Sequence, residues 1–323
     1  MPTDMLAIPP RKMWGWGPNV SGYCGSMSIQ TVALYFGNYL SQDKVRGATG
    51  GHDASHEIML GRSRCCSAFS IMQIFSLNAT QFPYWSVARP QHGRFVEWLH
   101  AAVANGDPVA FGLFMKTESN ANFDHIVPLV GFDEAGRIVF NDLHANVSLH
   151  EDLSTFVANR DACRAPLPWT ERWSYCLPKD VNFGVRVHGN ADMNRELLTA
   201  RLVMDDWSEP DYSTEDAKHE APARLGATLI ADTLRPHAPY ALLQFSDPGR
   251  VPNRNFLANA TGGVAARVDF HANASGAFAQ RVRFLSNETI FFRVVRRVGA
   301  IDSTDSAHPG HSHSHSPFSW RFV

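Results

Sequence analysis

The segments that predict helices are confined to the first third of the chain, and the segments that predict strands follow them. Apolar residues at three- and four-residue spacing predict helices over 26–40, 68–77 and 93–104. Short apolar runs predict strands over 109–114, 125–132 and 137–140, the last two joined by a hairpin turn at 133–136. Helices followed by antiparallel strands predict an α+β fold.

Beyond residue 183 the helical pattern nearly disappears. Short apolar or alternating runs, separated by Gly, Pro, Asn and Asp, occur at 197–204, 225–231, 240–245, 264–270, 278–284 and 290–298. This spacing predicts an all-β sandwich. We therefore expect a first domain over 1–185, a β-sandwich domain over 190–301 and a flexible His-rich tail over 302–323.

Composition restricts the partners of the chain. Its 323 residues are 44% hydrophobic, enough for a real core. The 29 basic and 31 acidic residues nearly balance, so no global field would hold the protein on nucleic acid or on an anionic membrane. No uninterrupted apolar run is long enough to predict a membrane span. The binding partner or substrate must therefore be inferred from a local site.

Glycosylation sequons favour a secretory or extracellular protein whose leader is absent from this chain. Six N-x-S/T triplets occur, more than chance would give, beginning at Asn19, Asn78, Asn146, Asn259, Asn273 and Asn287. The cysteines are Cys24, Cys65, Cys66, Cys163 and Cys176. If Cys24 is free, the adjacent Cys65 and Cys66 are too close to pair comfortably. Each is then expected to form a disulfide with Cys163 or Cys176, in one of two ways.

A cysteine lies where the strongest predicted helix begins. Cys24 follows Gly22 and Tyr23 and precedes Gly25, so we expect it at the helix N-terminus. The helix dipole and free backbone amides favour a thiolate there, which predicts a nucleophilic thiol with a lowered pKa. The flanking glycines would let a substrate chain approach closely.

Two downstream segments provide partners for this thiol. His125 opens an apolar strand, and the pair Asn141–Asp142 ends the next strand, which a hairpin turn would fold back beside it. A cysteine nucleophile needs an imidazole base, and the base needs a carboxylate or carboxamide to orient it. The set predicts an active site of Cys24, His125 and Asp142, with Asn141 as the alternative orienting residue.

Here the chain resembles a known family. Cys-Gly-Ser before a long helix, Asp-His-Ile-Val-Pro-Leu-Val-Gly-Phe-Asp at 124–133 and Ile-Val-Phe-Asn-Asp at 138–142 resemble the papain-like superfamily, closest to the C39-like peptidases. The resemblance covers about residues 14–180. It implies a helical half with Cys24, a β half with His125 and Asp142, and thiol peptidase or acyl-transfer chemistry without a cofactor.

The resemblance also bears on the oxyanion donor. The family's glutamine six residues before the nucleophile is replaced by Pro18, and Asn19 is the nearest carboxamide. Trp16, Gly22 and Tyr23 would line a substrate cleft or, equally, pack in the core. A metal site is not expected, since the spacing of the possible zinc ligands matches no common zinc module; those residues are His52, His56, Cys65 and Cys66.

Three functions follow from these patterns. The first is a cysteine hydrolase that cleaves a peptide or amide bond of a peptide or protein substrate through a thioester. The second is a transglutaminase-like acyl transferase. The third is a non-enzymatic binding protein built on a retired peptidase fold, whose β domain contacts protein or glycan.

Overall fold

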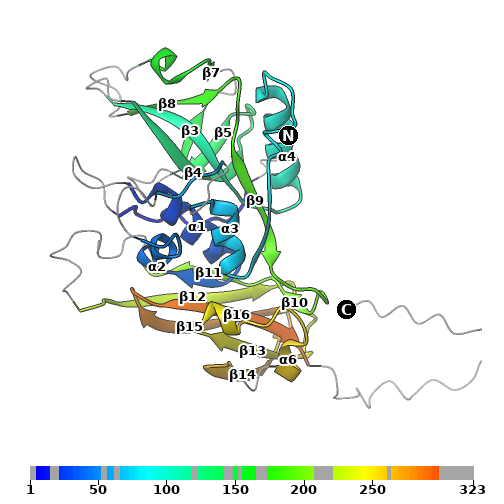
Figure 1. Cartoon of the computed structure of the whole chain (residues 1–323). Helices are drawn as coiled ribbons and strands as arrows, with labels where there is room; N and C mark the ends of the chain where they lie inside the picture. The colour runs from blue at the N-terminus through cyan, green and yellow to red at the C-terminus, as the bar shows by residue number, and fades with distance from the viewer. Residues whose placement is uncertain are drawn as a thin grey trace, which may run out of the picture.

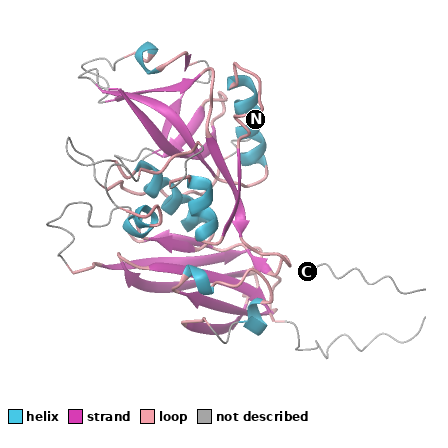
Figure 2. Cartoon of the chain, viewed as in Figure 1, coloured by secondary structure: helices cyan, strands magenta, loops and turns pink. Residues whose placement is uncertain are grey.

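The computed structural model describes residues 5–14, 22–51, 57–61, 66–117, 122–141, 148–151, 155–164, 173–206, 221–259 and 263–297. Figures 1 and 2 show three layers: a sheet at one end, a group of helices in the middle and further sheets at the other end. The helices are α1 (Cys24–Tyr35), α2 (Gln42–Gly47), α3 (Ala68–Ile74), α4 (His92–Ala104) and α6 (Phe256–Asn259). Short 3₁₀ helices are η2 (Arg160–Ala162) and η3 (Pro248–Arg250).

The first sheet contains eight of the described strands. It runs in the order β2-β9-β3-β4-β5-β6, with β8 also paired to β3 and β7 paired to β8. The bounds are β2 (Leu77–Gln81), β3 (Val109–Thr117), β4 (Asn122–Phe132), β5 (Ile138–Asn141), β6 (Ser148–Glu151), β7 (Phe156–Val157), β8 (Trp173–Pro178) and β9 (Gly184–Asn190). The strands expected over 109–140 are confirmed as β3, β4 and β5, and β4 pairs antiparallel with both neighbours.

Two antiparallel sheets form the other end of the molecule. One joins β1-β16-β13-β14, with β10 also on β16, and the other joins β11-β12-β15. The bounds are β1 (Asn38–Leu40), β10 (Leu197–Leu198), β11 (Arg201–Met204), β12 (Arg224–Asp232), β13 (Pro239–Phe245), β14 (Ala266–His271), β15 (Ala277–Leu285) and β16 (Thr289–Arg296). Both sheets contribute to one core that includes Leu202, Leu229 and Phe292. The strand-rich character expected beyond residue 183 is therefore confirmed.

The first helix is shorter than expected. It ends at Tyr35, and β1 begins three residues later, inside the range 26–40 predicted as one helix. Gly37 breaks the helix because its φ of +75° lies in the left-handed region, which glycine adopts without strain. A Cβ at Gly37 would also lie 3.1 Å from the carbonyl oxygen of Ala200.

Helix α1 is the central element of the fold. Every residue from Gly25 to Leu34 is buried, so the helix has no solvent face over that stretch. Its side chains enter three apolar clusters, through Ile29, Met27 and Leu34 respectively. Strand β1 then pairs with β16 near the other end of the chain. The expected boundary between domains near 185–190 stays a prediction, because α1 and β1 pack into both regions.

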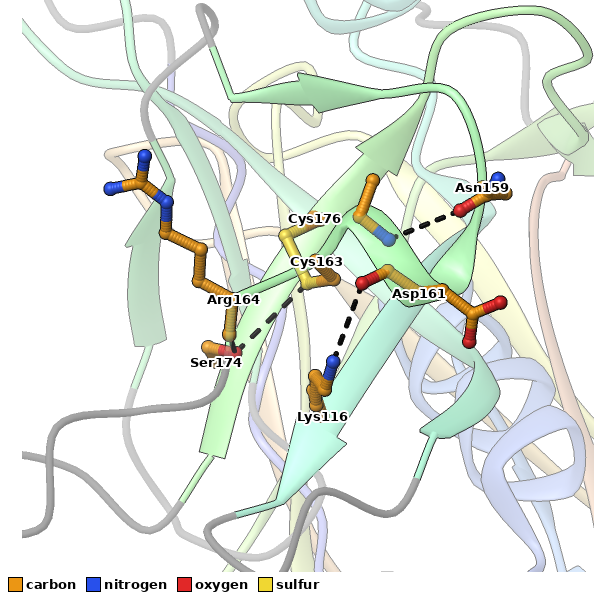
Figure 3. The surroundings of a disulfide bond; sticks show 8 residues. Lys116, Asn159, Asp161, Cys163, Arg164, Ser174 and Cys176 are labelled. Carbon is orange, nitrogen blue, oxygen red and sulfur yellow. Dashed lines mark hydrogen bonds between the residues drawn. A yellow bond between two sulfur atoms is a disulfide. The ribbon is translucent and has the colours of Figure 1, made fainter.

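The disulfide pairing expected from the sequence is wrong. Cys163 bonds Cys176, with their Cα atoms 5.8 Å apart (Figure 3). Cys163 follows η2, which packs on β3 and β4, and Cys176 lies on β8, which pairs with β3, so chain folding brings together two cysteines whose proximity the sequence spacing does not reveal. Neither cysteine is therefore available to Cys65 or Cys66, although Cys66 is itself disulfide-bonded.

Some expectations concern residues outside the described part of the chain. They include the His-rich tail over 302–323, the residues Trp16, Asn19 and Asp142, and three of the residues considered and rejected as zinc ligands, His52, His56 and Cys65. Among the helices that the structure does describe, none is long and apolar enough to cross a membrane.

Candidate functional site

Cys24 is the first residue of α1, as the sequence predicts. The residue is partly exposed, and of the cysteines within the described ranges it is the one with a free thiol. Tyr23 precedes the helix without making a side-chain capping hydrogen bond. The first backbone N–H groups of a helix lack intrahelical acceptors, so the amides near Cys24 are suited to an anion or a developing oxyanion.

The start of α1 is held against β4. The Ser28 hydroxyl donates a hydrogen bond to the carbonyl oxygen of Ile126, at 3.0 Å. The Cys24 sulfur accepts hydrogen bonds from the backbone N–H groups of Ile126 and Gly25. Ile126 follows His125 directly, so the fold brings the predicted nucleophile to the strand segment that carries the predicted base.

Gly25 allows the segment 57–61 to approach the nucleophile. A Cβ at Gly25 would lie 2.6 Å from the Cβ of Ile58 and 3.3 Å from the Cδ1 of Ile126. Real Cβ contacts are not that short, so a larger residue would displace Ile58. The glycine expected to admit substrate therefore admits this segment of the chain itself.

His125 lies in a buried aromatic environment. It is 2% exposed, and its ring stacks with that of Tyr175 at a centroid distance of 6.4 Å. Tyr175 also contacts Phe140 edge-on, at 5.2 Å. Cys24 packs against the apolar cluster that contains Tyr175 and Phe140, so the thiol and the imidazole adjoin the same cluster. A direct hydrogen bond between Cys24 and His125 stays a prediction.

The electrostatics of Cys24 correct the expectation of a lowered pKa. Burial is the largest influence and raises the pKa of the thiol, and the nearby Glu57 carboxylate raises it further. The hydrogen bonds from Ile126 and Gly25 and the positive charge of Arg46 lower it, but they do not reverse the effect of burial. The resting thiol is therefore mainly neutral at pH 7.

Arg46 is a site residue that sequence analysis missed. Its side chain is 1% exposed and reaches from α2 to the turn before the nucleophile. The Nη1 atom donates to the carbonyl oxygen of Gly22, at 3.2 Å, and the guanidinium lies 4.9 Å from the centroid of the Tyr23 ring. Tyr23 is itself 2% exposed and its ring lies 6.0 Å from that of Trp14, in the apolar cluster that contains both rings. No local pattern distinguishes Arg46 from a surface arginine in the sequence.

Of the two candidate orienting residues, the structure describes Asn141. Asn141 is buried, and its Nδ2 donates to the carbonyl oxygen of Ile8, at 3.3 Å. Successive side chains of a strand point to opposite faces, so Asn141 lies on the face away from Phe140. The rings of Phe140 and His125 both contact the ring of Tyr175, so Phe140 lies on the His125 side of the strand. This arrangement does not favour Asn141 as the orienting residue, and Asp142 stays a prediction.

Comparisons with known proteins leave the site to be interpreted from its geometry. No protein-family model matches the chain, and no curated protein matches its sequence significantly. Among the described residues, no group of three or more His, Cys, Asp or Glu side chains is arranged to hold a metal ion.

Proposed function

We propose that the protein is a cysteine hydrolase of the papain-like superfamily, closest to the C39-like peptidases, which cleaves a peptide or amide bond. One observation carries the proposal. The free thiol of Cys24 at the start of α1 accepts a hydrogen bond from the amide of Ile126, next to the buried His125. A cysteine nucleophile is activated by an imidazole base within hydrogen-bond reach, and this arrangement places the two on neighbouring segments.

The raised pKa of Cys24 indicates general-base activation rather than a preformed ion pair. His125 takes the thiol proton as the sulfur attacks the substrate carbonyl and forms the carbon–sulfur bond. His125 then gives that proton to the leaving amine as the carbon–nitrogen bond breaks. Water attacks the thioester with His125 again acting as base, which releases a carboxylic acid and restores the thiol.

Two groups support this chemistry in the proposal. The backbone amide of Cys24 and the carboxamide of Asn19 stabilise the oxyanion. Asp142 orients His125, in preference to Asn141, whose carboxamide donates to Ile8.

An irreversible thiol-directed peptide probe, such as a peptidyl acyloxymethyl ketone, tests the proposal. We expect labelling of Cys24 in the folded protein, no labelling of Cys24→Ala and at least about tenfold slower labelling of His125→Ala, since general-base catalysis contributes about 10²–10⁴-fold. His188→Ala is the matched control. It lies on β9 rather than β4 and is exposed, and its ring nitrogens lie 2.8 Å from Asp107 and 2.9 Å from Thr80.

Equal labelling of His125→Ala and His188→Ala would contradict the assignment of the base. Labelling that appears only after denaturation would favour the non-enzymatic binding protein. The acyl-transferase alternative shares the thioester, and product analysis with an added amine separates it, because transfer yields a new amide where hydrolysis yields an acid.

A further inference from the structure

A groove lies at the seam between the helical layer and the terminal sheets. It has a volume of about 500 Å³ and is lined by the ends of α2 and α3, the turn after β13 and the turn between β15 and β16. That volume falls within the range of about 300–1,000 Å³ that small-molecule sites have. The groove does not border Cys24, so the proposed hydrolase chemistry leaves it unexplained.

The lining combines apolar and polar groups. Ile74 is 50% exposed, and Pro248 lies in the same wall. Lys44 and Asp247 are exposed charged residues of the lining. A pyranose ring presents an apolar C–H face and a rim of hydroxyl groups, so this lining suits a sugar better than a purely apolar ligand.

One residue of the lining can carry a sugar covalently. Asn287 begins the sequon Asn-Glu-Thr, is exposed, and its carboxamide makes no hydrogen bond to any residue that the structure describes. The turn that carries it is well held. The backbone N–H of Ser41 donates to the carbonyl oxygen of Glu288, at 3.1 Å. The Thr289 hydroxyl donates to the carbonyl oxygen of Ser246, also at 3.1 Å. Such a turn would hold an attached group over the groove.

The disulfide supplies an independent indication of compartment. Disulfides such as Cys163–Cys176 form in the oxidising secretory pathway, where N-linked sugars are also attached. We propose that Asn287 carries an N-linked glycan whose first sugars occupy this groove and cover Ile74. The Nδ2 atom of Asn287 forms a bond to C1 of the first sugar and loses a proton. The lipid diphosphate of the oligosaccharide donor is the leaving group.

Asn273 is the matched control for this proposal. It also begins a sequon and is exposed at the turn between β14 and β15, but it is not part of the groove. Its Oδ1 accepts hydrogen bonds from the backbone N–H groups of Ser275 and Ala277, at 3.1 and 2.8 Å. A glycan on Asn273 would therefore extend into solvent without covering an apolar surface.

The test uses the full chain secreted from eukaryotic cells through an added leader. Peptide mass spectrometry should find the Asn287 peptide glycosylated, and Asn287→Gln should lower Tm by about 2–4 °C, the size of one modest lost interaction. At the control site, Ser275→Ala removes the sequon but leaves the Asn273 Oδ1 as acceptor for the backbone N–H groups of Ser275 and Ala277, and it should lower Tm by clearly less. When both proteins are made in cells whose N-glycosylation is inhibited, Asn287→Gln should no longer lower Tm relative to the parent.

Two results overturn the proposal. An unmodified Asn287 peptide would exclude the modification. If Asn287 is glycosylated but Asn287→Gln lowers Tm no more than Ser275→Ala does, the groove is excluded as the place where the sugars lie. Neither result bears on Cys24, so this inference and the proposed hydrolase fail separately.

Discussion

Replacing Ser28 by alanine should weaken the attachment of α1 to β4. The buried Ser28 hydroxyl donates to the carbonyl oxygen of Ile126 at 3.0 Å, and its removal leaves a buried acceptor without that donor. Such a loss costs about 1–3 kcal/mol. The better helix propensity of alanine offsets about 0.5 kcal/mol of it. We expect Ser28→Ala to lower the free energy of unfolding by about 0.5–2.5 kcal/mol.

Ser26 is the control on the same helix. It is equally buried, but its hydroxyl has no hydrogen-bond partner within the described part of the chain. Ser26→Ala removes an unsatisfied polar group and adds helix propensity, so it should stabilise the protein by about 0.5–2 kcal/mol. The two substitutions are chemically identical, and only the partner of the hydroxyl differs.

Urea unfolding of the two variants measures the difference, and iodoacetamide labelling of Cys24 reports on the site. Ser28→Ala should have a lower midpoint urea concentration of unfolding than the parent, and Ser26→Ala should have an equal or higher one. Since Ser28 lies one helical turn after Cys24, only Ser28→Ala should change the labelling rate. Equal shifts in the two variants would show that the contact between Ser28 and Ile126 does not hold α1 on β4.

Three further predictions concern the same region. Gly25→Ala should destabilise the protein, because overpacking against Ile58 costs about 1–3 kcal/mol and the gain in helix propensity is only about 1 kcal/mol. It should also speed alkylation of Cys24, because the new methyl group displaces the segment 57–61. Unchanged urea unfolding and an unchanged labelling rate would contradict this prediction. Because burial raises the pKa of Cys24, the neutral thiol contributes stability that is fully present below about pH 8.5 and is lost as the pH rises through the folded-state pKa. The free energy of unfolding in urea should therefore fall less between pH 7 and pH 10 for Cys24→Ala than for the parent. Arg46→Met should move the pH profile of Cys24 alkylation to higher pH, because the positive charge of Arg46 lowers the pKa of the thiol. Arg293→Met, at an equally buried arginine on β16, should leave the profile in place. Identical profiles for the two variants would remove Arg46 from the site.

Local patterns were enough to predict the strands around the site. The apolar runs and the turn at 133–136 predicted β4 and β5, and the glycine-flanked Cys24 predicted the start of α1. These features depend on residues that are neighbours in the sequence. The same is true of the strand-rich second half, whose runs are separated by turn residues.

Features that depend on distant partners were not predictable in this way. Strand β1 forms because β16, about 250 positions later, supplies its partner. The pKa of Cys24 follows from burial beneath surrounding chain, which outweighs the helix N-terminus that the sequence does reveal. The role of Arg46 likewise arises because α2 folds back on the turn before Cys24.

The most direct test of the central claim is a search for an acyl group on Cys24 during turnover. Reaction with p-nitrophenyl acetate should give a burst of p-nitrophenolate close to one equivalent per protein. Mass spectrometry of the acid-quenched protein should then locate an acetyl group on the Cys24 peptide. His125→Ala should slow the burst at least about tenfold. No burst, or acetylation only at lysines and at an equal rate in Cys24→Ala, would contradict the assignment of Cys24 as the nucleophile.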